Sequence, residues 1–235
     1  LDLGDVVMHI NVTADDIYQD IKKKILNFEL VPGQVLSENA ISRQYQVSRT
    51  LVREALGRLK SDTLIEVYPS KGTYITLLNF KEIKDIIYVR TAVEQKVYSD
   101  AMRLNASSLL EEMELNLARQ KAILSEEPSI CIFRELDTEF HKLVYSAVNR
   151  IYVWNRINDM LYHYRRFCMM DLSMNRPYST LYEEHRKIYQ AFKTRDIELL
   201  NVTLYEHLNN NIQRFEKDNN DHFYVFFEDI NETTN

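Results

Sequence analysis

Four side chains in the second half of this 235-residue chain have the types and the spacing to bind a metal ion. They are Asp137, His141, His185 and His207. The first two stand four residues apart, so on a helix both side chains point to the same side. Three neutral imidazoles and a carboxylate suit a divalent transition-metal ion such as zinc, nickel, iron or manganese.

Three alternatives remain open for these residues. A lone helical histidine is more often a packing or surface residue than a ligand. A metal held there could be purely structural and close a helical bundle. With open coordination positions, the same set could activate water in a metal-dependent enzyme, but the sequence shows no general base or nucleophile beside the ligands.

Residues 47–56 carry chemistry of a different kind. Ser48 can cap a helix, and Arg49 and Arg53, four residues apart, project from one side of it. Guanidinium groups there could reach phosphates or the O6 and N7 acceptors of guanine. The opposite side is apolar and carries Val52, Leu56 and Leu59. Without its flanks, this stretch is also typical of a solvated surface helix.

The flanking elements make this helix a candidate DNA-recognition helix. An apolar stripe with helical spacing begins near Ala14, Ser37 starts a second short helix, and Gln46 lies in a tight link before Ser48. Two β-prone runs, 64–69 and 73–76, then enclose a turn with Lys71 at its tip, where it could meet a phosphate, and with Gly72, which permits a positive φ. A helix-turn-helix followed directly by a β-hairpin predicts a winged-helix domain.

The rest of the chain predicts helices. Only four Gly and four Pro occur in the whole sequence, which favours a mainly helical protein. We expect an antiparallel bundle of six or seven helices, including one continuous helix from Ile151 to about Met174. The predicted division is a DNA-binding domain at 14–78, a helical domain at 79–220 and a C-terminal tail at 221–235, whose aromatic run 222–227 is too apolar to remain in solvent.

Charge and composition further limit the class of protein to which the chain can belong. The chain has a net charge of -6, yet residues 17–78 contain nine Lys and Arg against six Asp and Glu, which indicates a DNA-facing module on an acidic body. Two cysteines are too few for a disulfide framework. No apolar run approaches the roughly 20 residues of a membrane span, so we expect a cytoplasmic protein without a membrane partner.

The segment 32–72 resembles the N-terminal domain of GntR-family bacterial transcription regulators. The resemblance is carried by Pro32-Gly33, Leu36-Ser37-Glu38, Val47-Ser48-Arg49-Thr50, Val52-Arg53-Glu54-Ala55-Leu56, Arg58-Leu59 and Pro69-x-Lys71-Gly72. It implies that the recognition helix enters the major groove and the hairpin tip reaches the minor groove. The DNA-contacting residues it implies are Ser48, Arg49, Thr50, Arg53 and Gly72, with Lys71 on a phosphate. Gln46 stands where relatives usually have glycine.

Residues 90–208 are similar to the FCD domain of the FadR subgroup of that family. The matching motifs are Arg90-x-x-Val93-Glu94, Leu136-Asp137-x-x-Phe140-His141, Glu184-His185-x-x-Ile188 and His207-Leu208. The resemblance implies that Asp137, His141, His185 and His207 hold a metal ion inside the bundle and that a small organic acid completes its coordination shell.

An effector carboxylate also calls for a cation besides the metal, because a guanidinium both orients and neutralises it. The candidates are Arg90, Arg165 and Arg166. The sequence therefore predicts a ligand-responsive transcriptional regulator, not an enzyme, that binds palindromic operator DNA as a homodimer. A small carboxylate metabolite at the metal site would control it.

Overall fold

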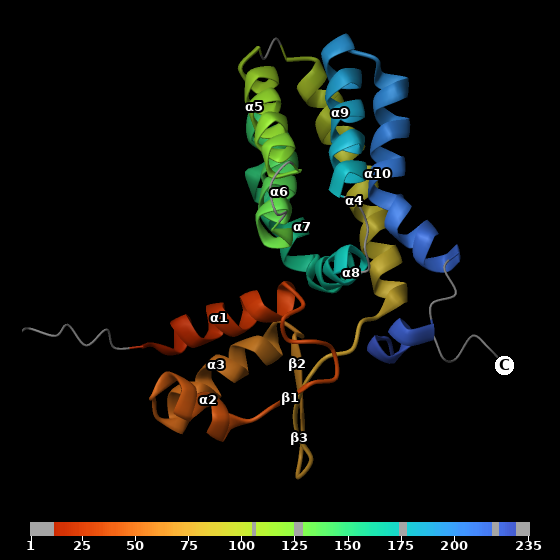
Figure 1. The fold of residues 1–235 in the computed structure, drawn as a ribbon. Coiled ribbons are helices and arrows are strands. Elements are labelled where there is room, and N and C mark those ends of the chain that lie inside the picture. The colour runs from red at the N-terminus through yellow and green to blue at the C-terminus, as the bar shows by residue number, and fades with distance from the viewer. Residues whose placement is uncertain (1–11, 105–106, 125–128, 174–177, 218–220, 229–235) are drawn as a thin grey trace, which may run out of the picture. The chain divides into compact units, whose positions relative to one another are not determined.

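The computed structural model describes residues 12–104, 107–124, 129–173, 178–217 and 221–228. The chain divides into two compact units, Leu1–Leu77 and Leu78–Asn235 (Figure 1). Among the described residues, no helix is long and apolar enough to span a membrane.

The first unit opens with α1 (Ala14–Leu26). Thr13 and Asp16 form a capping box at its start, because each side chain bonds to the other's backbone N–H. The apolar side of α1 is buried and contains Ile17, Ile21 and Ile25. It packs against the helix α3 (Arg49–Ser61).

The predicted helix-turn-helix is formed by α2 (Glu38–Tyr45) and α3 (Arg49–Ser61). Ser37 and Ser48 cap them, each accepting a hydrogen bond from a first-turn backbone N–H. Gln46 ends α2 in the left-handed conformation, with φ 55°, and so makes the tight turn. The apolar side of α3 is buried as expected: Val52 and Leu59 are 0% exposed and Leu56 is 5% exposed.

The predicted hairpin is present and gains a third strand. β2 (Ile65–Tyr68) pairs antiparallel with β3 (Gly72–Ile75), and Gly72 has φ 129°. On its other side β3 pairs with β1 (Val35–Leu36), which gives the order β1-β3-β2. β1 ties the loop between α1 and α2 to the wing, which we define as β2, β3 and their turn.

The second unit is helical. Its elements are α4 (Phe80–Met102), α5 (Ser107–Leu124), α6 (Ile130–Ala147), α7 (Ile151–Met160), α8 (Tyr162–Ser173), α9 (Tyr178–Thr194), α10 (Ile197–Lys217) and a short 3-10 helix, η1 (Asp221–Phe226). In Figure 1, α5, α6, α9 and α10 run side by side, and α8 crosses their lower end. The contacts of α8 with α4 and α10 place it within the same core.

The predicted extent of one helix is wrong. The predicted helix from Ile151 to Met174 is two helices, α7 and α8, separated at Leu161. No Gly or Pro marks this break. Leu161, Tyr164 and Phe167 are all less than 5% exposed, so the change of direction follows from burying these side chains in the bundle, a tertiary effect that periodicity does not reveal.

The aromatic C-terminal segment packs on its own unit. Phe227, 2% exposed, joins Phe80, Phe167 and Phe215, with ring centroids 5.0 to 6.4 Å from its own. Leu78 donates its backbone N–H to Phe226 O at 2.7 Å and accepts from Glu228 N at 3.1 Å. Residues 229–235 of the expected tail lie outside the described residues.

Candidate metal centre and DNA-binding surface

Three helices of the bundle bring the four predicted ligands together. Asp137 and His141 come from α6, His185 from α9 and His207 from α10. One ligand atom from each lies within 4.8 Å of the others, and all four residues are buried. His141 Nε2 is 3.1 Å from His207 Nε2, and His185 Nε2 is 3.3 Å from Asp137 Oδ1. The four donors therefore surround one point inside the bundle.

Each imidazole is oriented through its other ring nitrogen. His141 Nδ1 is 2.9 Å from Glu94 Oε2, and His207 Nδ1 is 2.9 Å from Glu184 Oε2. His185 Nδ1 is 2.8 Å from the amide oxygen Oε1 of a third residue, Gln120 on α5. The carboxylates of Glu94 and Glu184 and the amide oxygen of Gln120 favour a proton on Nδ1 of each ring, and the Tyr98 hydroxyl also lies 3.2 Å from His141 Nδ1. The Nε2 lone pairs are thereby directed at the common point.

The fourth donor is fixed by an arginine. Arg134, one turn before Asp137 on α6, donates from Nη1 to Asp137 Oδ2 at 2.9 Å. Burial alone would raise the pKa of the Asp137 carboxyl, but the charge of the Arg134 guanidinium holds it well below its usual range. Asp137 is therefore a carboxylate, with Oδ1 on the side of the histidines.

Burial keeps the three imidazoles neutral. It lowers the pKa of His141, His185 and His207, and this desolvation outweighs the carboxylates beside them. Neutral imidazoles and an ionised carboxylate are the protonation states that a metal ion requires of its ligands.

The donor set passes a further test of fit to a metal ion. His185 Nε2 is buried at the centre of the group and makes no hydrogen bond to any described residue. A buried nitrogen lone pair without a donor costs free energy, and a cation at that point would satisfy it. Three imidazole nitrogens and one carboxylate oxygen match zinc, nickel, iron or manganese.

Two of the three expected effector arginines, Arg90 and Arg165, interact electrostatically with Asp137 of this centre. Arg90 is 4% exposed, bonds to Glu94 Oε1 at 2.6 Å and lies over the ring of Tyr164. Burial lowers the pKa of Arg165 to about 10, with further lowering by Arg134 and Arg90, while Asp137 raises it. Arg165 also donates to Asn158. Three guanidinium groups, those of Arg90, Arg134 and Arg165, thus share the region around the Asp137 carboxylate.

Arg166 has other surroundings. It is fully buried, its Nη2 is 3.1 Å from His163 Nδ1, and its charged neighbours are Glu228 and Glu82. Glu228 belongs to the C-terminal segment and Glu82 to the first turn of α4. Of the three arginines, only Arg90 and Arg165 interact electrostatically with Asp137 among the described residues.

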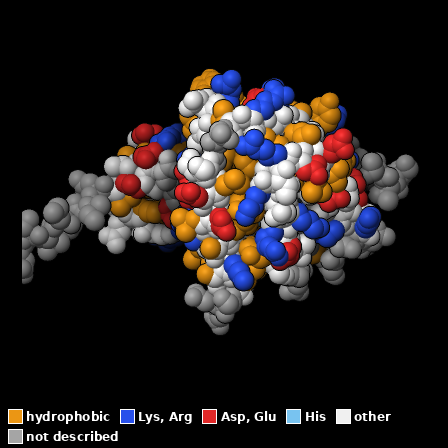
Figure 2. Space-filling view, turned by 90° about the horizontal axis from the view of Figure 1, so that it is seen from above, with side chains coloured by type: hydrophobic (Ala, Val, Ile, Leu, Met, Phe, Trp, Pro, Cys, Tyr) orange, Lys and Arg blue, Asp and Glu red, His pale blue; other side chains and the backbone are white. Residues whose placement is uncertain are grey.

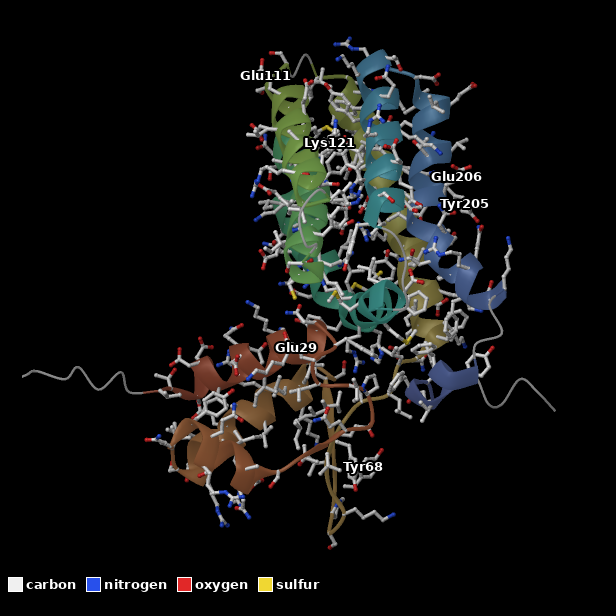
Figure 3. The ribbon with its side chains drawn as sticks, viewed as in Figure 1. Glu29, Tyr68, Glu111, Lys121, Tyr205 and Glu206 are labelled. Carbon is white, nitrogen blue, oxygen red and sulfur yellow. The ribbon has the colours of Figure 1, made fainter. Side chains whose placement is uncertain are left out.

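The bundle surface is mixed in character, which contrasts with the buried centre. Figure 2 shows basic, acidic and apolar side chains interspersed across one face. On α10, Tyr205 is 50% exposed and the neighbouring Glu206 is also exposed, whereas the next residue, His207, is 4% exposed (Figure 3). The helical period thus separates the candidate ligand His207 from the surface within two residues.

In the first unit, the expected DNA-contacting side chains of α3 and of the wing tip are exposed. These are Ser48, Arg49, Thr50, Arg53 and Lys71. Arg53 makes an ion pair: its Nε lies 3.0 Å from Glu38 Oε2 on α2.

Gln120 and Arg134 were not predicted from the sequence. Arg134 had a signal, because it precedes Asp137 by one helical turn. Gln120 had none, since it lies 65 residues from His185 and meets it only through packing of α5 on α9. Glu94 and Glu184 stood inside the motifs, but no role was predicted for them.

Comparisons with known protein families match both units. Residues 13–75 match the family described as bacterial regulatory proteins, gntR family, and residues 85–210 match the FCD domain. A winged helix followed by a helical ligand-binding domain defines a class of DNA-binding regulators, not of enzymes. The chain belongs to the GntR family of transcription regulators, in its FadR-like subgroup with an FCD effector-binding domain.

Individual relatives agree with this assignment. The chain is 27% identical over 210 residues to the HTH-type transcriptional repressor RspR of Escherichia coli K12, covering 88% of this chain and 92% of RspR. It is 24% identical over 202 residues to the gluconate operon transcriptional repressor of Bacillus subtilis 168, covering 83% and 81% of the two chains.

Solved structures show the same fold. E. coli McbR/YncC superposes with a TM-score of 0.71 at 20% identity over 88% of this chain and 98% of that one. A GntR regulator from Rhodococcus sp. RHA1 gives a TM-score of 0.65 at 20% identity, over 87% and 98% of the two chains.

Proposed function

We propose that this regulator binds a palindromic operator as a homodimer and responds to a small carboxylate at a divalent metal in its bundle. The buried Asp and three His, each with an orienting partner, are the observation that carries the proposal. Residues 14–78 bind DNA, residues 79–220 bind the metal and effector and dimerise, and residues 221–235 form a C-terminal tail, of which Phe227 packs on the bundle.

A metal ion would be held by Asp137, His141, His185 and His207, as a zinc, nickel, iron or manganese ion. When bound, it supplies a Lewis-acid site for an oxygen ligand. Arg90 and Arg165, with Arg134 beside them, supply positive charge for the effector carboxylate. Arg166, with Glu82 and Glu228 as neighbours, is the weakest of the predicted effector residues.

The DNA contacts are assigned to the exposed end of α3 and to the wing. Ser48, Arg49, Thr50 and Arg53 face the major groove, while Lys71 and Gly72 reach the minor groove and its phosphates. One winged helix reads few base pairs, so a dimer on two half-sites supplies the affinity that an operator requires. Effector binding that favours one spacing of the two recognition helices would then change operator affinity.

The DNA assignment is tested with Arg49→Ala and Lys71→Ala. If Arg49 reads a base, its loss weakens operator binding by about 1 to 3 kcal/mol and leaves random DNA less affected. Lys71→Ala weakens operator and random DNA alike, because a phosphate contact carries no sequence information. Fluorescence anisotropy on both duplexes measures this. Equal losses on the two duplexes for Arg49→Ala contradict base reading.

The metal assignment is tested with His185→Asn, which removes one of four ligands. We expect the purified protein to lose most of its bound divalent metal, as measured by plasma mass spectrometry and zinc titration. His163→Asn is the matched control, because His163 lies beside Asn79 and Glu82. If chelation lowers the melting temperature while carboxylate binding persists, the metal is structural and the effector role is wrong.

A further inference from the structure

The ion pair between Glu38 and Arg53 connects the two helices of the helix-turn-helix. Glu38 is the first residue of α2, and Arg53 lies in the second turn of α3. Their side chains are 34% and 67% exposed, so both are accessible to a ligand of this surface. The contact joins Arg53 Nε to Glu38 Oε2 at 3.0 Å.

A bond at Nε has a specific consequence for a guanidinium group. It holds the inner edge of the planar fork and leaves the terminal Nη1 and Nη2 hydrogens pointing outward. This outer pair matches the O6 and N7 acceptors of guanine. Among the described residues, no hydrogen bond to Arg53 Nη1 or Nη2 competes for it.

The ion pair also changes how much side-chain entropy Arg53 loses when it binds DNA. A free arginine on a helix surface populates many rotamers and loses side-chain entropy when it is immobilised. An exposed ion pair contributes little to the stability of the fold, but it biases those rotamers before DNA arrives. The Glu38 carboxylate, meanwhile, repels phosphates and so weakens binding that relies on charge alone.

We propose that Glu38 is a specificity-determining residue that positions Arg53 for one base pair in each half-site and disfavours nonspecific DNA. The inference rests on the proposed DNA contact of Arg53. It adds that an acidic residue on the non-recognition helix improves discrimination although its charge opposes DNA binding.

The experiment uses the full chain and two changes at Glu38, one that removes the charge and one that keeps it. The preferred site of the wild-type protein is selected from a pool of randomised duplexes, and affinities are then measured for that site, for single base-pair variants of it and for random duplex. Glu38→Gln removes both the charge and the ionic contact. Glu38→Asp keeps the charge but shortens the side chain by one methylene, so it weakens the contact alone.

For Glu38→Gln we expect sequence preference to fall while affinity for random duplex rises. The preference at one base pair per half-site falls roughly three- to tenfold, whereas random duplex binds severalfold more tightly and with a steeper salt dependence. Glu38→Asp loses the same preference without the gain on random duplex. Arg53→Ala relaxes the same base pair. Glu29→Gln, which makes the same charge change after the end of α1, leaves the preference intact (Figure 3).

Several outcomes overturn the proposal. If Glu38→Gln changes site and random affinities by the same factor and in the same direction, Glu38 has only a general role in stability or charge. If it relaxes a base pair other than the one relaxed by Arg53→Ala, it does not act through Arg53. If Arg53→Ala leaves every preference intact, the assumed contact of Arg53 is wrong, whatever Glu38 does. Thermal melting of each variant identifies any loss of folding.

Discussion

At the scale of single residues, the partners that orient the histidines are expected to affect metal affinity nearly as much as the candidate ligands. Gln120→Ala removes the acceptor at 2.8 Å that fixes the ring of His185. We expect divalent-metal affinity to fall about 10- to 100-fold while all four ligands remain, because the ring and its tautomer are no longer held. Competition titration against a zinc chelator measures this. The control is Gln190→Ala, an exposed glutamine on α9, and an equal loss in both variants contradicts the role of Gln120.

The sequence predicted the four candidate ligands, which the structure brings together, but only part of their support. Asp137 and His141 share one face of one helix, a relation that four residues of spacing define. Gln120 and His185 are brought together by the packing of α5 on α9, which no local pattern specifies. The same holds for Glu38 and Arg53, 15 residues apart on two helices whose relative angle depends on the turn between them.

At the scale of elements, the turn between α2 and α3 stores strain at Gln46. A residue with a Cβ costs about 1 to 2 kcal/mol in the left-handed conformation, whereas glycine does not. Gln46→Gly is therefore expected to raise the free energy of unfolding by up to about 1 kcal/mol, since glycine's greater freedom in the unfolded chain offsets part of the gain. Urea denaturation checks this. Gln46→Ala, which keeps a Cβ, should show no comparable gain.

The starts of α2 and α3 could be predicted from their capping side chains, whereas other element boundaries depend on tertiary packing. Ser37 and Ser48 cap α2 and α3 as their types predict. The two-residue strand β1 is too short for an alternating pattern, and it forms because β3 offers a free edge. The division at Leu161 has no local breaker, so the sequence predicted one helix where the core requires two.

At the scale of the whole molecule, the buried histidines make the metal-free protein sensitive to mild acid. Their pKa values lie below the ordinary 6.5 in the folded state. As pH falls through about 6.5, the unfolded chain takes up protons that the folded chain refuses, so stability declines toward lower pH. We expect the melting temperature of chelator-treated protein to drop between about pH 7 and pH 5. His185→Asn should flatten the decline, and a constant melting temperature across this range in the parent protein contradicts it.

The C-terminal segment imposes an order on how the bundle is completed. Asn79 bonds to Glu228 at 2.5 Å across a separation of 149 residues, next to the two backbone bonds between Leu78 and that segment. During synthesis, α4 emerges from the ribosome long before this partner exists. The winged helix, whose contacts are local by comparison, can fold first. The start of α4 acquires its contacts with residues 226–228 only when those residues have been synthesised. A ribosome stalled before them would therefore present a folded winged helix attached to an incomplete helical domain.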